Sequence, residues 1–189
     1  MLAPEYPIRT ERLLLRPLRP SDAEQMVVYK SDADAVRYVP YDPLTLAEVE
    51  ERLATRWSTS RFEKVGDAIC LGVEEQETGR LVGDIVLFWR NEEDREGEVG
   101  YILDPAFSGR GYATEAVSAL LDLGFDGLGL HRIAARIDER NTASARVAER
   151  LGLRREARFV EGSWFKGEWT TLLVYGILDR EWRTRSDRP

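Results

Sequence analysis

The chain has 189 residues, 27 of them basic and 34 acidic, which gives a formal net charge of −7 and a sequence pI of about 5.0. A single cysteine and a single histidine exclude an internal disulfide and a multi-histidine metal site within one chain, and we expect no metal. The acidic balance argues against nucleic-acid binding. No segment is apolar enough for a membrane span, and residues 1–5 lack the features of a signal peptide, so we expect a cytoplasmic protein.

The first half of the chain predicts strands and helices in clear blocks. Residues 8–17 predict a strand that ends at prolines. Helices are expected at residues 22–29 and 44–61, the second opened by a capping box that Thr45 and Glu48 form. Short turns then separate β-rich segments that indicate an antiparallel meander, at residues 68–74, 81–89 and 98–103.

The second half returns to mixed structure. A glycine-containing loop leads into a helix at residues 113–124, and Asn141 is expected to cap another helix after an intervening strand. The remaining expected elements are strands at residues 132–138, 153–160 and 172–178, a helix at 141–151 and a polar tail at 183–189. The order predicts an α/β (α+β) fold in a single domain spanning residues 1–189, with a core at about 8–182. Its mostly antiparallel sheet would have about seven strands, flanked by about four helices.

The segment at residues 98–116 carries the clearest chemical signal. A strand enters a loop containing Gly109 and Gly111, and the loop opens a helix. Glycine lets the backbone approach a ligand, and the free N–H groups at a helix start favour an anion. Arg110 adds a cation, so the loop predicts a phosphate or pyrophosphate site, with a simple turn as the alternative. The loop lacks the Lys-Ser/Thr pair of a P-loop, and Thr114 replaces the third glycine of a dinucleotide fingerprint.

An ordered set of further motifs accompanies this loop. They are Thr10-Glu-Arg-Leu-Leu-Leu-Arg16, Gly100-Tyr101, Ser108-Gly-Arg-Gly111-Tyr-Ala113, Gly111-Tyr-Ala-Thr-Glu-Ala116, Leu130-His-Arg-Ile133, Asn141-Thr-Ala-Ser144, Glu149-Arg-Leu-Gly152 and Lys166-Gly-Glu-Trp169. Together they resemble the GNAT superfamily of acyl-CoA-dependent N-acetyltransferases over about residues 8–182, and are most similar to its Rim-type ribosomal-protein N-terminal acetyltransferases. Ser108 departs from the Gln or Arg usual in the family loop. Leu153, Thr170 and Thr171 also depart from the family pattern, which puts the acceptor pocket in question.

The resemblance implies the reaction and its ligands. An acetyl group would pass from acetyl-CoA to a primary amine, by direct attack in a ternary complex, and the sheet would splay at the acyl-CoA site. The acceptor would be a protein N-terminus or a small amine such as an amino sugar or polyamine, and the branch is compatible with a homodimer. The acyl-CoA-binding residues implied are Tyr101, Ile102, Leu103, Ser108, Gly109, Arg110, Gly111, Tyr112, Ala113, Thr114, Asn141 and Ser144.

Two residues are candidates for proton transfer. The resemblance implies that Glu98 is the general base, acting on the ammonium group through water, and that Ser144 protonates the leaving thiolate or holds a water that does. The alternatives are a solvated strand carboxylate for Glu98, a helix cap for Asn141 and a first-turn helper for Ser144. His131 is expected to be structural.

Other functions stay open at this stage. A CoA-binding sensor without turnover, or an acyltransferase that uses a longer or succinyl donor, fits the same motifs. A nucleotide-dependent oxidoreductase is a weaker alternative, because the meander and the missing third glycine count against it.

Overall fold

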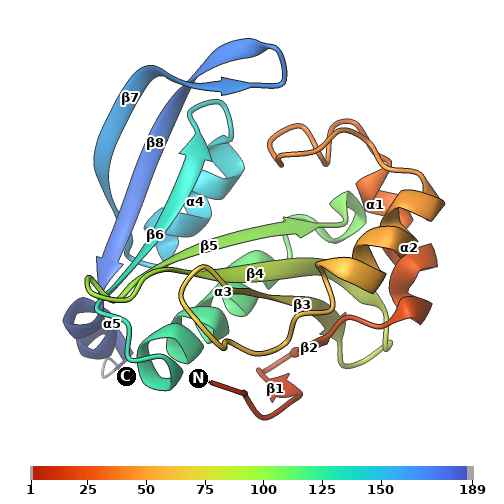
Figure 1. Cartoon of the computed structure of the whole chain (residues 1–189), viewed down its shortest axis with the longest axis horizontal. Helices are drawn as coiled ribbons and strands as arrows, with labels where there is room; N and C mark the ends of the chain where they lie inside the picture. Colours follow the sequence, from red (N-terminus) through yellow and green to blue (C-terminus); the bar gives the residue numbers. More distant parts are fainter. Residues whose placement is uncertain (1, 187–189) are drawn as a thin grey trace.

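The computed structural model describes residues 2–186 and arranges them around one open eight-stranded sheet (Figure 1). The order across the sheet is β1-β2-β3-β4-β5-β6-β8-β7, and each neighbouring pair is antiparallel except β5 with β6. The strands are β1 (Ile8–Arg9), β2 (Leu13–Pro17), β3 (Ala68–Glu75), β4 (Leu81–Asn91), β5 (Glu96–Leu103), β6 (Arg132–Asp138), β7 (Arg154–Phe165) and β8 (Glu168–Leu178). The predicted mixed, mostly antiparallel sheet is confirmed.

Helices cover both faces of this sheet. The layer of α1 and α2 packs on one face, and α3 lies on the other (Figure 1). The α-helices are α1 (Ala23–Lys30), α2 (Leu46–Thr55), α3 (Tyr112–Asp122), α4 (Thr142–Arg150) and α5 (Asp179–Ser186). Short 3-10 turns occupy Pro20–Asp22 and Pro105–Phe107, and a π-helical turn, Leu123–Gly127, extends α3. Thr45 and Glu48 form the predicted capping box at the start of α2.

The predicted first strand is divided in two, which raises the number of strands from about seven to eight. Thr10 makes the intervening turn: its N–H donates to the carbonyl of Leu13 at 3.0 Å, and its hydroxyl accepts the N–H of Leu13 at 3.0 Å. A side chain that bonds the backbone locally in this way competes with a strand ladder. The turn falls on the polar residues 10–12, between Ile8 and the leucines of β2.

The C-terminal tail prediction is wrong for residues 183–186, which belong to α5. The helix is anchored by the buried ring of Trp182, whose indole N–H donates to Asp122 at 2.6 Å, and by Arg183, which contacts Asp126 at 2.9 Å. Because α5 buries one large apolar side chain, that of Trp182, its sequence lacks the periodic spacing of apolar residues that predicts a helix. Residues 187–189 lie outside the described residues.

Helix α2 spans Leu46–Thr55 and is therefore shorter than the predicted helix at residues 44–61. The late hairpin, by contrast, is longer than predicted. Strands β7 and β8 are joined only by Lys166 and Gly167, both at positive φ, so the expected loop at Gly162 is part of β7. The hairpin tip reaches the segment between α1 and α2, where Lys166 Nζ donates to the carbonyl of Val36 at 2.9 Å.

Alternation along β5 assigns its side chains to two layers. Glu98 and Ile102 project toward the face covered by α1 and α2, whereas Val99 and Tyr101 project toward the face covered by α3. We call these the α2 face and the α3 face.

The sheet splays where β5 meets β6. The two strands pair only from Glu96 with Arg132 to Glu98 with Ala134. Beyond that point β6 continues along β8, and β5 continues along β4 (Figure 1). The edge of β5 from residue 99 to 103 therefore has no strand partner on its β6 side, which confirms the predicted splay.

Candidate functional site

A cavity of about 550 Å³ fills the opening between β5 and β6. Tyr101 and Ser144 line it from the α3 face, while Glu98 and Asp84 line it from the α2 face. Two reactants can therefore approach one point from opposite sides of the sheet. Among the sequence-predicted site residues, the cavity brings together Glu98, Tyr101, Ile102, Asn141 and Ser144.

On the α3 face, a hydroxyl pair joins β5 to α4. Tyr101 donates its hydroxyl to Ser144 Oγ at 3.1 Å. Burial raises the pKa of Tyr101, so its hydroxyl stays protonated at neutral pH. Nothing in the sequence pairs these residues, which lie 43 positions apart.

Asn141 starts α4 as predicted. Its side-chain oxygen accepts the N–H of Ser144 at 3.1 Å, which fixes the first turn and aims Ser144 at the cavity. The side-chain nitrogen of Asn141, Nδ2, makes no hydrogen bond with the described residues, whereas the backbone N–H donates to the carbonyl of Asp138 at 2.8 Å. The cap and the ligand-binding interpretations of Asn141 are therefore compatible.

On the α2 face, Glu98 forms an ion pair with Arg90, whose Nε lies 3.0 Å from Glu98 Oε2. The Glu98 side chain is 19% exposed and lines the cavity. Glu98 is therefore a partly buried strand carboxylate that forms an ion pair with a half-exposed arginine.

The glycine loop lies outside the cavity lining, at the start of α3, and Val117 one turn later reaches the cavity. Gly109 and Gly111 have φ values of +77° and +82°, a conformation that favours glycine. The first N–H groups of α3 have no intrahelical partner. The backbone from residue 109 to 113 therefore keeps the geometry expected of an anion site.

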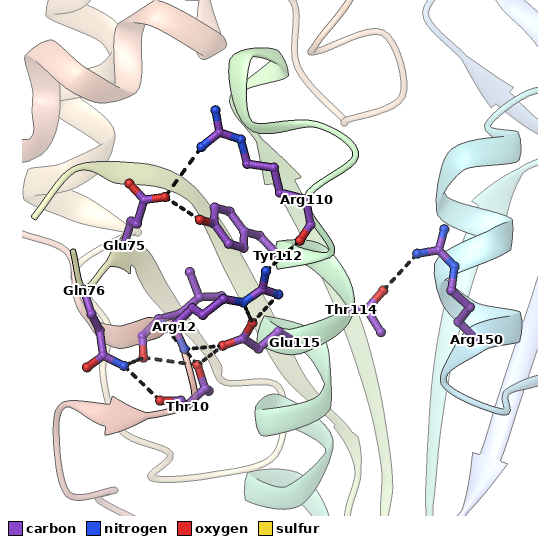
Figure 2. Close-up of polar contacts among 10 residues, drawn as sticks. Thr10, Arg12, Glu75, Gln76, Arg110, Tyr112, Thr114, Glu115 and Arg150 are labelled. Atoms are coloured by element: carbon purple, nitrogen blue, oxygen red, sulfur yellow. Dashed lines mark hydrogen bonds and ion pairs between the residues drawn. The ribbon is translucent and has the colours of Figure 1, made fainter. Parts of the chain in front are cut away.

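Two loop side chains lie differently from what a phosphate site suggests. Arg110 stacks on Phe107, 5.0 Å from its ring centre, and its Nη1 is 3.7 Å from Glu75 (Figure 2). Tyr112 is buried and also donates its hydroxyl to Glu75. Leu103, Ser108, Ala113 and Thr114 do not line the cavity either. Of the predicted ligand-binding groups of the loop, the backbone N–H groups therefore fit an anion site better than these side chains do.

A clamp from the N-terminal segment holds the start of α3 (Figure 2). The Glu115 carboxylate accepts three hydrogen bonds: from the hydroxyl of Thr10 at 2.5 Å, from the backbone N–H of Arg12 at 2.7 Å and from Arg12 Nε at 2.8 Å. Arg12 Nη1 also donates to the carbonyl of Arg110 at 2.9 Å. Burial opposes the charge on Glu115, but these hydrogen bonds outweigh it and lower the pKa of Glu115.

Sequence reasoning missed a cation beside the loop. Arg150 of α4 donates to the hydroxyl of Thr114 at 3.4 Å across the gap between α4 and α3 (Figure 2). It forms no ion pair with the described residues, so its charge is available at the start of α3. Only its position on the exposed side of a helix was visible in the sequence.

A buried polar network at the base of the α2 face was also missed. Lys30 is 0% exposed, and its Nζ lies 2.8 Å from Asp84 and 2.9 Å from the hydroxyl of Tyr41. Tyr29 donates to Asp84 at 2.8 Å, and Cys70 lies beside it with a thiol pKa that burial raises. These residues come from α1, β3, β4 and, for Tyr41, the segment between α1 and α2, so no local sequence motif predicts the network.

No group of three or more metal-ligating side chains gathers within residues 2–186, and no helix in that range is long and apolar enough to cross a membrane. His131 lies in the turn before β6, outside the cavity lining.

A sheet split beside a glycine-rich helix start is the architecture of an acyl-CoA-dependent acyltransferase. A protein-family model described as "Acetyltransferase (GNAT) domain" matches residues 12–154 of the chain. The chain belongs to the GNAT acetyltransferase family and is an acetyl-CoA-dependent N-acetyltransferase.

Three comparisons illustrate the relationship. An uncharacterized N-acetyltransferase of Bacillus subtilis is 31% identical over 93% of this chain and 98% of its own. A GNAT-family acetyltransferase structure from Bacillus anthracis has a TM-score of 0.82 at 32% identity, and covers 92% of this chain and 99% of its own. Spermidine N(1)-acetyltransferase of Escherichia coli is 23% identical over 93% of this chain and 90% of its own.

Proposed function

We propose that this chain acts as a single catalytic domain that transfers acetyl from acetyl-CoA to a primary amine by direct attack in a ternary complex. The observation that carries the proposal is the cavity lined from both faces of the sheet. The donor occupies the α3 face and the amine the α2 face. Holding the two reactants in line supplies several kcal/mol of the barrier reduction.

Donor binding uses mainly backbone groups. The edge of β5 opposite β4 can pair with the amides of the pantetheine arm as an added strand would. The N–H groups of residues 109–113 and the dipole of α3 bind the pyrophosphate, with Arg150 as a nearby cation. Asn141 offers its amide nitrogen to the arm from the start of α4.

Amine activation is assigned to Glu98. The acceptor amine must lose a proton before it can attack, and Glu98 is the cavity-lining carboxylate on the strand beside the thioester. It takes the proton directly or through one water. A backbone N–H of β5 stabilises the oxyanion that forms when the amine attacks.

Departure of the thiolate is assigned to the hydroxyl pair. Ser144 supplies the proton to sulfur, and Tyr101 replaces it through the 3.1 Å hydrogen bond. The two proton transfers therefore take place on opposite faces of the sheet, which keeps the base and the acid apart.

The acceptor class stays broad in this proposal: a protein N-terminal amine or a small-molecule amine. A CoA-binding sensor without turnover is the second candidate, for which the departures from the family pattern at Leu153, Thr170 and Thr171 leave room. An enzyme with a succinyl donor is the third. A homodimer is compatible with each.

Ligand-induced thermal stabilisation and CoA release test the proposal together. Acetyl-CoA and CoA should each raise the melting temperature, NADH should not, and thiol release should require an amine. A ligand at a hundredfold excess over its Kd stabilises by about 2.7 kcal/mol. Stabilisation without thiol release from any amine would favour the sensor.

A matched pair of glycine variants locates the donor site. Gly109 and Gly129 both have positive φ, so Asp strains the backbone at both, and a Cβ at either meets nothing within 4 Å. Gly109→Asp should weaken acetyl-CoA stabilisation, because it places a carboxylate at the pyrophosphate. Gly129→Asp should leave it unchanged. Equal effects would place the donor elsewhere.

A further inference from the structure

The charged side chains that line the cavity all belong to its acceptor side. Strand residues among them share the face of Glu98, and the others come from α2 and its C-terminal end. They are Arg52, Arg56, Arg90, Arg136, Asp84, Glu98 and Asp138. The donor side contributes hydroxyls, an amide and apolar groups. The charge balance of this cavity therefore concerns the acceptor.

Each cavity carboxylate is already neutralised by a cation of the protein itself. The pairs are Asp84 with Lys30 at 2.8 Å, Glu98 with Arg90 at 3.0 Å and Asp138 with Arg140 at 2.7 Å. By contrast, Arg52, Arg56 and Arg136 form no ion pair with any residue in the described range 2–186. The acceptor side thus carries positive charge that no carboxylate in contact neutralises, and Arg52 interacts at longer range with Glu48, one turn earlier on α2.

Arg52 is held in place by aromatic rings. Its guanidinium lies 5.0 Å from the ring centre of Tyr41 and 5.6 Å from that of Trp57. The ammonium of Lys30 lies 4.3 Å from the Trp57 ring centre. The rings of Tyr41 and Trp57 would otherwise attract a cationic acceptor such as a polyamine, but the protein's own cations already lie against them. Arg56 follows Arg52 by one turn and also lines the cavity.

We infer that the acceptor amine carries an anionic group, a carboxylate or a phosphate, which Arg52 and Arg56 bind while the amine faces Glu98. Guanidinium groups match the planar geometry of a carboxylate or the oxygens of a phosphate, and bind both through paired hydrogen bonds. The inference rests on the proposed acetyl transfer and narrows its substrate class. A polyamine, which brings only positive charge, is disfavoured at this site.

Matched acceptors test the inference with acetyl-CoA as the donor and thiol release as the readout. The pairs differ only in charge: dipeptides against their C-terminal amides, peptides with Glu against Gln at the second position, and an amino sugar against its phosphate ester. Spermidine is the cationic comparison. We expect kcat/KM to be at least tenfold higher for the anionic member of at least one pair. Which pair responds identifies the source of the anion.

Arginine variants link that preference to α2. Arg52→Gln and Arg56→Gln should each raise the KM of the anionic acceptor about tenfold or more, and so lower the ratio of kcat/KM between the anionic acceptor and its neutral partner. Arg37→Gln is the control, because Arg37 is an exposed arginine between α1 and α2, paired with Asp34 and outside the cavity lining. Thermal unfolding with acetyl-CoA verifies that each variant is folded.

The outcomes separate this inference from the proposed function. Faster turnover of the neutral members or of spermidine overturns the inference and leaves acetyl transfer intact. A charge preference that appears only when succinyl-CoA replaces acetyl-CoA also overturns it, because the anion then belongs to the donor. Absence of thiol release from every amine overturns both.

Discussion

Glu98 and Tyr101 lie three positions apart on one strand and therefore project to opposite faces of the sheet. The strand thus places a candidate base with the acceptor and a candidate acid with the donor. Their surroundings differ accordingly: Glu98 forms an ion pair with Arg90, whereas burial raises the pKa of the Tyr101 hydroxyl. The division of roles follows from strand geometry.

Replacing Glu98 by glutamine should lower kcat at least a hundredfold at neutral pH, because general-base catalysis contributes about 10² to 10⁴-fold. The KM for acetyl-CoA should stay near that of the parent enzyme. Glu96→Gln is a matched control: Glu96 is on the same strand and paired with Arg132, but does not line the cavity. Steady-state kinetics at neutral pH would measure both parameters. Equal losses in both variants would assign Glu98 a structural role.

Replacing Tyr101 by phenylalanine should lower kcat about tenfold or more, because the hydroxyl pair that serves the thiolate is broken. Tyr175→Phe is the control, since Tyr175 also donates to a side chain, Glu149, at 3.2 Å, but outside the cavity. A double-mutant cycle with Ser144→Ala measures the coupling. If the two losses multiply in the double variant, the residues act independently and the relay is excluded.

Among the elements, α3 is positioned by a strand pair far from it in sequence. Thr10 and Arg12 lie in the turn between β1 and β2, and Glu115 is 103 residues from Arg12 (Figure 2). The carbonyl of Arg110 is held by the same guanidinium. The N-terminal motif and the loop motif, recognised separately in the sequence, are thus two halves of one clamp.

We expect Glu115→Gln to raise the KM for acetyl-CoA severalfold and to reduce stability by about 1 to 3 kcal/mol, because it weakens charge-assisted hydrogen bonds in a partly buried site. Glu181→Gln is the matched control: Glu181 also accepts from an arginine, Arg154, and from a backbone N–H, that of Leu178, but on α5. Acetyl-CoA titration and urea unfolding report the two effects. A KM change of equal size in both variants would show that the clamp does not position the loop.

The parts of the fold that the sequence predicted correctly have local causes. The Thr45 capping box, the Asn141 cap and the glycine loop each depend on residues within one turn. The parts it missed depend on distant contacts: α5 is anchored on Asp122 by Trp182. The same holds for the candidate site: local sequence motifs predicted its elements, β5, α3 and α4.

The hydroxyl pair, the position of Arg150 and the network around Lys30 required the packed structure. Each joins residues from different elements, such as Lys30 of α1 with Asp84 of β4. The side chains of Arg110 and Tyr112 were assigned to the ligand by motif, yet both lie against Glu75. A motif specifies the backbone of such a loop better than it specifies where the side chains point.

For the whole molecule, two opposing charge effects shape stability against pH. With 34 acidic and 27 basic residues, the chain repels itself at neutral pH, and titration toward its pI of about 5.0 relieves that repulsion. Below this range the carboxylates that accept hydrogen bonds in the fold take up protons and lose those interactions. Protonation therefore lowers stability, whereas the relief of charge repulsion raises it, and the two effects act in separate pH windows.

Glu115, Asp138 and Glu75 all have pKa values lowered by hydrogen bonds to their charged forms. Because the folded pKa lies below the unfolded value of 4.5 for Glu and 3.8 for Asp, their stabilisation is fully present above about pH 4.5. It is lost as the pH falls through the lowered values.

Urea unfolding from pH 3 to 7 should therefore show maximal stability between about pH 5 and 6, and a steep fall below 4.5. Glu115→Gln should flatten that fall, because the variant no longer binds a proton at this site. Glu77→Gln, at an exposed turn position, should leave the slope unchanged. Stability that rises from pH 5 to 3, or equal slopes for Glu115→Gln and the parent chain, would show that the clamp carboxylate is not linked to folding. The clamp that orients α3 would then stabilise the fold without governing its acid limit.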